Sequence, residues 1–173
     1  MRKLAPFIVL LALVSCNNET PKTAAETPAP ATDSVTYPYP IGYSSKFEFI
    51  DPAKGKMILD LWKAYDNNSF DNIKDKFADT VTMIFPEISM HASRDSVIAG
   101  AKSARNAYTT VISKVDVVMS VRSTDKNGDW VVVWGDETHT PKNNKTDSVA
   151  IHEVWGLNKA GKIEFMQQYH SKK

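Results

Sequence analysis

With 173 residues, a formal net charge of +1 and 42% hydrophobic residues, the chain has the size and composition of one globular domain preceded by a shorter region. That length is enough to bury a core. The balanced charge lacks the basic excess typical of nucleic-acid-binding domains, so we expect no nucleic-acid partner. Cys16 is the single cysteine, which excludes a disulfide bond within the chain.

The N-terminus has the pattern of a secretory signal peptide. A basic start, Met1-Arg2-Lys3, precedes an apolar run over residues 4–14 that is too short to span a membrane. The run ends in Leu13-Val14-Ser15-Cys16, which resembles the lipobox of bacterial lipoproteins. This resemblance implies cleavage before Cys16, lipidation of its thiol and amine, and anchoring to a membrane of the cell envelope. Several acyl chains together hold a protein stably on a bilayer.

The region after Cys16 predicts a tether. Residues 17–43 are rich in Pro, Thr, Ala and Ser, and such a composition cannot bury enough apolar surface to order itself. We therefore divide the chain into a signal peptide at 1–15, the lipidated Cys16 with its tether at 16–46, and a folded domain at 47–173.

Three helices and two short strands are predicted at the start of the domain. Asp51-Pro52 is a favourable helix start. The apolar stripe of the helix that follows is Met57, Ile58, Leu61, Trp62 and Tyr65. A short second helix is indicated by Phe70, Ile73 and Phe77. Strands are expected at 81–85 and 87–92. Ser93 caps a third helix that extends to about Tyr108.

The last third of the chain predicts a meander of four β-strands, at residues 112–123, 130–137, 148–157 and 162–170. The first alternates apolar and polar residues, as in a half-buried strand. The second is apolar on both faces, as in a central strand. Asn127-Gly128 supplies the turn chemistry of a tight hairpin. Short polar turns between strands of this length favour antiparallel pairing.

Three segments of the domain carry a family pattern: residues 69–79, the strand Val81-Thr82-Met83-Ile84-Phe85-Pro86, and the pair His152-Glu153-Val154-Trp155 with Ala160-Gly161-Lys162-Ile163. In their order and spacing they resemble the nuclear transport factor 2-like (NTF2-like) superfamily, especially its SnoaL-like branch. The resemblance implies an α+β fold, a cone-shaped curved antiparallel sheet wrapped around three N-terminal helices. It also implies an apolar pocket at the wide end, and in many members a dimer through the outer sheet face.

Comparison with the ketosteroid isomerases of this superfamily indicates whether the site could catalyse their reaction. Their general base is an Asp directly before the Pro that ends the first strand, where this chain has Phe85. Their Tyr donor aligns with Trp62, whose indole N–H donates but does not titrate. Their protonated Asp aligns with Glu153. Because Phe85 cannot accept a proton, we reject the isomerase mechanism.

Two residues are the candidate acid/base groups. Glu153 shares its predicted face with Ile151 and Trp155, and a carboxylate among apolar neighbours has a raised pKa. It would then donate a hydrogen bond or act as a general acid; a Glu at the lip or in an ion pair is the alternative. His91 is the second candidate, near the end of a short strand. Alternation places His152 on the face opposite Glu153.

An apolar ligand site is predicted from aromatic residues around the cone: Trp62, Tyr65, Phe85, Tyr108, Trp134 and Trp155. The histidines have no ligand spacing that predicts a metal site, and no cofactor motif is present. Three functions stay open. The first is a cell-envelope lipoprotein that binds a small apolar ligand or a protein partner. The second is a SnoaL-like acid/base enzyme using Glu153 and His91. The third is a dimeric adaptor with an apolar outer face around Val131, Val133 and Val154.

Overall fold

The computed structural model describes residues 35–142 and 145–172; the expectations for the signal peptide and Cys16 fall outside these ranges. The folded domain lies within the unit Tyr39–Lys173. Its elements in chain order are β1 (Phe47–Phe49), α1 (Ala53–Asp66), the 3₁₀ turn η1 (Lys74–Lys76), β2 (Phe77–Ile84), β3 (Ser89–Ser93), α2 (Arg94–Arg105), β4 (Tyr108–Ser123), β5 (Asp129–Pro141), β6 (Asp147–Leu157) and β7 (Ile163–Lys172).

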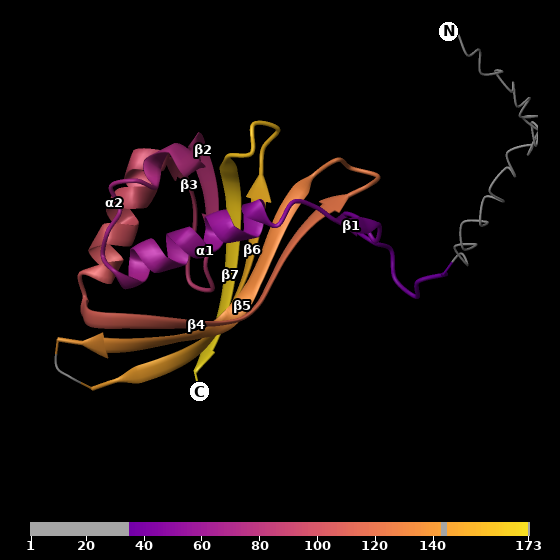
Figure 1. Ribbon diagram of the computed structural model, residues 1–173. Helices are drawn as coiled ribbons and strands as arrows, with labels where there is room; N and C mark the ends of the chain where they lie inside the picture. The colour runs from indigo at the N-terminus through magenta and orange to yellow at the C-terminus, as the bar shows by residue number, and fades with distance from the viewer. Residues whose placement is uncertain (1–34, 143–144, 173) are drawn as a thin grey trace, which may run out of the picture. The chain divides into compact units, whose positions relative to one another are not determined.

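One curved sheet holds all seven described strands, in the order β1-β4-β5-β6-β7-β2-β3. The predicted four-strand meander is β4 to β7, paired antiparallel throughout. The helices lie on one side of this sheet, with α1 across β4 and β5 and α2 on β2 and β3 (Figure 1). The predicted α+β cone is thus confirmed. One pair, β2 with β7, is parallel, so the sheet is mixed rather than wholly antiparallel.

The helix predictions hold at α1 and α2 but change between them. The Asp51 carboxylate accepts from the backbone N–H of Ala53 at 2.9 Å, at the start of α1. Ser93 caps α2 by accepting from the N–H of Ser96 at 3.2 Å. The predicted second helix is a turn followed by the short η1. Phe77 pairs with Ile163 in the β2–β7 ladder, and this pairing requires an extended backbone that a helix lacks.

The curvature of the sheet has a local cause at Gly135. The register of β4 against β5 shifts between Val115 and Val117, opposite this glycine. A Cβ atom on Gly135 would lie 2.0 Å from the carbonyl oxygen of Lys114, so only glycine allows the two backbones to approach this closely. Bulges of this kind bend a strand and increase its twist.

The concave face of the sheet meets the helices in the core. Val131 and Val133 of β5 are fully buried there, next to Trp155 of β6. The expectation that Val131 and Val133 form an exposed outer face is therefore wrong: in a strand only alternate residues share a face, and Val154, opposite Val132, lies on the other one. Among the described residues, no helix is long and apolar enough to cross a membrane.

Candidate functional site

Glu153 is buried in the cone and its carboxylate is hydrogen-bonded on both oxygens. Oε2 accepts from the indole N–H of Trp62 at 2.6 Å and from that of Trp155 at 2.9 Å. Oε1 accepts from the side-chain amide of Gln168 at 2.8 Å. Trp62 comes from α1, Gln168 from β7, and the other two from β6. Three elements of the fold thus meet at one carboxyl group, which is 5% exposed.

Two opposing influences act on Glu153. Burial is the larger and raises the pKa of this carboxyl, since a charged group is disfavoured away from water; the nearby Glu137 adds to the rise. The three N–H donors lower the pKa, because they stabilise the anion. Oε2 already faces two donors, so a proton on this group belongs on Oε1, the oxygen next to Gln168. Glu153 can therefore offer a hydrogen bond only on the side that Gln168 covers.

Tyr65 and Phe85 are both half-buried and pack against the core cluster. Burial, followed by the charge of Glu137, raises the pKa of Tyr65 to about 12, so its phenol stays protonated and can donate but not act as a base. Phe85 follows β2 and packs against the core, where it supplies no titratable group. The side chains that hydrogen-bond Glu153 are thus two indoles and an amide, and none of them is a base.

His91 does not join this cluster. It is exposed on β3, and its Nδ1 lies 3.0 Å from Oγ1 of Thr82. Thr82 stands between the buried Val81 and Met83 in β2, so both Thr82 and His91 belong to the face turned away from the core. Glu153 and His91 cannot contact one bound molecule from opposite faces of the sheet.

The predicted aromatic wall is only partly assembled. Trp62 and Trp155 contact Glu153, and Tyr65 and Phe85 pack against the core cluster. Tyr108, in contrast, stacks on His139 at a ring distance of 4.5 Å. His139 also contacts Glu137 through its Nε2. Trp134 lies on the outer face, next to His152 across the β5–β6 pair at 5.3 Å. The reason is again alternation, since Trp134 follows the buried Val133.

Comparison with known proteins adds evidence about the fold. No protein-family model and no curated protein matches the sequence. Solved structures do match. An NTF2-like protein of unknown function from Exiguobacterium sp. 255-15 aligns with a TM-score of 0.56 at 14% identity, over 66% of this chain and 98% of its own. The domain has the NTF2-like fold.

Two further solved structures match at similar levels. A protein with a ketosteroid isomerase-like fold from Catenulispora acidiphila DSM 44928, solved in complex with trimethylamine, gives a TM-score of 0.55 at 14% identity, over 67% of this chain and 85% of its own. The epoxide hydrolase/cyclase-like enzyme SalBIII, of pyran ring formation in the polyether salinomycin, gives 0.53 at 13% identity, over 69% and 91%.

The roles of two residues of this NTF2-like domain could not be predicted from the sequence. Gln168 becomes visible only from the register, because it pairs with Glu153 across β6 and β7. Arg105 is a buried cation that donates to the carbonyl oxygens of Tyr65, Asp66 and Tyr108 at 2.8 to 2.9 Å. It satisfies carbonyls at the C-terminus of α1, where a positive charge is favoured. No local pattern around Arg105 signals this role.

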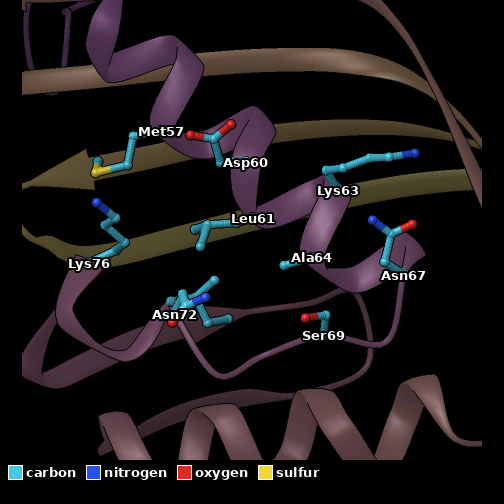
Figure 2. A pocket seen from close by; sticks show the side chains of 10 residues that line it. Met57, Asp60, Leu61, Lys63, Ala64, Asn67, Ser69, Asn72 and Lys76 are labelled. Atoms are coloured by element: carbon cyan, nitrogen blue, oxygen red, sulfur yellow. The ribbon is translucent and has the colours of Figure 1, made fainter.

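Glu153 lines neither of two cavities in the NTF2-like domain. A groove of about 330 Å³ runs between α1 and the segment that follows it (Figure 2). Its lining residues are Met57, Asp60, Leu61, Lys63, Ala64, Asn67, Ser69, Asn72, Ile73 and Lys76. A second cavity of about 280 Å³ lies beside β1 and includes Phe49 and Val118. Within the described ranges, no group of three or more His, Cys, Asp or Glu is arranged to hold a metal ion.

Proposed function

We propose that this protein is a lipid-anchored cell-envelope protein whose NTF2-like domain binds a small ligand without catalysing an acid/base reaction. The observation that carries the proposal is that the carboxylate of Glu153 is enclosed by protein groups. Both of its oxygens are held by protein donors, and neither described cavity reaches it. Its partners keep the carboxyl in the core, where an exchange of protons with a substrate would require Gln168 to leave.

The groove along α1 is the site that we propose for the ligand (Figure 2). Its volume of about 330 Å³ is within the range of small-molecule sites. Leu61 and Ala64 give it an apolar floor, while Asn67, Ser69 and Asn72 add groups that donate and accept hydrogen bonds. An uncharged or weakly charged molecule with an apolar face and several hydroxyl or amide groups fits this lining.

The membrane part of the proposal rests on the sequence. The basic start, the apolar run and the four residues ending in Cys16 support cleavage and lipidation. We therefore propose a bacterial cell-envelope location with the domain held on the membrane by its lipid. A Cys16→Ala variant should lose incorporation of an alkyne fatty acid and leave the membrane fraction. If Cys16→Ala stays with membranes, the anchor is not the lipid.

An acid/base enzyme is the second candidate, favoured by the raised pKa of Glu153 and by the enzyme SalBIII among the matching structures. In that case Gln168 would swing away and the substrate would donate to or accept from Oε1. A dimeric adaptor is the third. It is favoured by an outer sheet face on which Tyr169 is 55% and Ile112 63% exposed, beside Trp134.

One NMR titration distinguishes these candidate functions, because the tryptophan indoles lie in different parts of the domain. Trp62 and Trp155 report the Glu153 cluster, and Trp134 the outer face. Adding a panel of small alcohols, amides and sugars to ¹⁵N-labelled protein should shift backbone amides around Leu61 and Asn72, with the Trp62 and Trp155 indole signals in place. Selective shifts of those two indoles would contradict the proposal and favour the enzyme. Concentration-dependent shifts of Trp134 without ligand would favour the adaptor.

A further inference from the structure

The start of the domain carries four large apolar side chains that face solvent. Tyr39 and Phe49 are each 79% exposed, and Ile41 and Phe47 each 47%. Phe47 and Phe49 lie on the same face of β1, because Glu48 separates them in an extended strand. We call these four residues the aromatic edge. Several large apolar side chains left exposed within one short stretch of chain are unusual on a free surface and mark a contact site.

The β1 part of the aromatic edge, Phe47 and Phe49, is held on the domain by pairing with β4. Phe47 pairs with Ser123 of β4, and the N–H of Ile50 donates to the carbonyl of Ser120 at 3.0 Å. Tyr43 lies between Ile41 and Phe47 in the sequence, and its hydroxyl lies 3.0 Å from Oγ of Ser123 and accepts from the indole of Trp130 at 3.2 Å. β1 thus lies beside the tip of the β4–β5 hairpin (Figure 1).

An apolar cavity adjoins the edge and enlarges its surface. The cavity of about 280 Å³ has Phe49, Ile50 and Pro52 on one side and Val118 and Met119 on the other. Aromatic side chains next to an apolar recess suit a lipid bilayer, in which rings lie at headgroup level and chain segments enter the recess.

The position of the edge along the chain points to one occupant. About 23 residues separate Cys16 from Tyr39, so a fully extended chain between them reaches at most about 80 Å. If Cys16 carries lipid, as proposed above, the aromatic edge is the part of the domain that follows the anchor first. A tether of this length keeps the edge at a high effective concentration near the bilayer. Weak interfacial contacts then suffice, because the lipid already supplies the first attachment.

We propose that the aromatic edge rests in the headgroup region of the membrane to which Cys16 is anchored, and so fixes the orientation of the domain. This inference depends on the proposed lipid anchor. Charge plays a small part, because the exposed Lys46 and Lys126 are offset by Glu48 and Asp125. We therefore expect similar contact with zwitterionic and anionic lipids.

The test uses the full-length lipidated protein reconstituted into phosphatidylcholine vesicles. Once Cys16 is blocked by lipid, a cysteine introduced by Tyr39→Cys is the single free thiol and can carry an environment-sensitive fluorophore. The matched position is Asp147→Cys, exposed at the start of β6 and far along the meander from β1. We expect a blue shift at position 39, and loss of emission with lipids that carry a quencher on the upper acyl chain, but neither effect at position 147.

Variants and controls sharpen the outcome. Phe47→Ser with Phe49→Ser should reduce the quenching at position 39, whereas Ile112→Ser, exposed on β4, should not. Equal quenching at positions 39 and 147 would overturn the proposal, as would emission that depends on protein concentration in detergent, since the edge would then bind a second copy. Fatty-acid labelling of Cys16 is scored separately. A labelled chain without quenching refutes the aromatic edge alone, while an unlabelled chain refutes the anchor and this proposal with it.

Discussion

The Glu153 cluster and the aromatic edge both contain aromatic residues, but these are buried in the cluster and exposed at the edge. In the cluster, the indoles of Trp62 and Trp155 are buried and both donate to one carboxylate. At the edge, Tyr39 and Phe49 are largely exposed, with no such partner to enclose them. Aromatic content alone therefore does not identify a binding site. What differs is whether hydrogen bonds and packing are completed within the domain, and that difference predicts which region tolerates change.

The largest effect should come from deleting the indole of Trp62. Trp62→Ala removes a buried ring and one donor to Glu153, so we expect a loss of about 3–5 kcal/mol in the free energy of unfolding. Phe49→Ala, at the exposed edge, should change it by less than about 0.5 kcal/mol. Urea denaturation measures both. Equal losses would contradict the contrast between the two regions.

The second effect concerns pH. Burial raises the pKa of Glu153 in the folded state, so that state holds the proton more tightly than the unfolded chain does. The stability from this group is complete below its ordinary pKa of 4.5 and is lost as pH rises through the raised value. Glu153→Gln should remove this loss of stability at higher pH.

Asp129 provides a control of opposite sign. Its hydrogen bond from Arg122, assisted by Lys54, lowers the pKa of this carboxyl. Its contribution is present above the ordinary pKa and is lost as pH falls through the lowered one. Unfolding measured at a series of pH values should separate Glu153→Gln from Asp129→Asn by the sign of the change. The same pH slope in wild type and Glu153→Gln would argue against a tuned Glu153.

A smaller effect is expected at Gln168. Gln168→Met leaves Oε1 of Glu153 without its protein donor, and the loss of a hydrogen bond to a buried group costs about 1–2 kcal/mol. Gln167→Met is the matched variant, because Gln167 donates to the exposed Tyr169 hydroxyl and should matter little. If the two variants unfold alike, Gln168 is not a structural partner of Glu153.

The smallest effect should be at Tyr43, which attaches the aromatic edge to the hairpin. Tyr43→Phe removes a hydroxyl that contacts Ser123 and Trp130 and should cost about 0.5–1 kcal/mol. Hydrogen exchange of the β1 amides should rise more than that of β5. An unchanged exchange rate in β1 would mean that the ladder to β4, rather than Tyr43, holds the edge.

Sequence patterns predict the elements whose causes are local. Alternation places the four strands of the meander, and the Ser93 cap marks the start of α2. The inward direction of Glu153 follows from its apolar companions on β6. The mixed sheet was not predicted, because the parallel β2–β7 pair joins segments far apart in the chain. For the same reason Phe77 lies in a strand, although its spacing from Phe70 and Ile73 fits a helix.

The candidate site was predicted less completely than the fold. Its acid and two tryptophan partners were named from the sequence, but Gln168 depends on the β6–β7 register, and Arg105 acts on carbonyls from three other residues. The exposure of the residues before β1 was harder to infer from the sequence than the secondary structure. The segment before β1 has the composition of a tether, and only the contacts of Tyr43 show that the chain is attached to the domain at that residue.

The central claim is that the Glu153 cluster is closed and that contacts with other molecules occur outside it. Hydrogen exchange of the four indole N–H groups tests this claim most directly. We predict that the indoles of Trp62 and Trp155, both bonded to Glu153, exchange far more slowly than that of Trp134 on the outer face. Rapid exchange at Trp62 and Trp155, in protein whose β5 amides stay protected, would show an open cone and contradict the account.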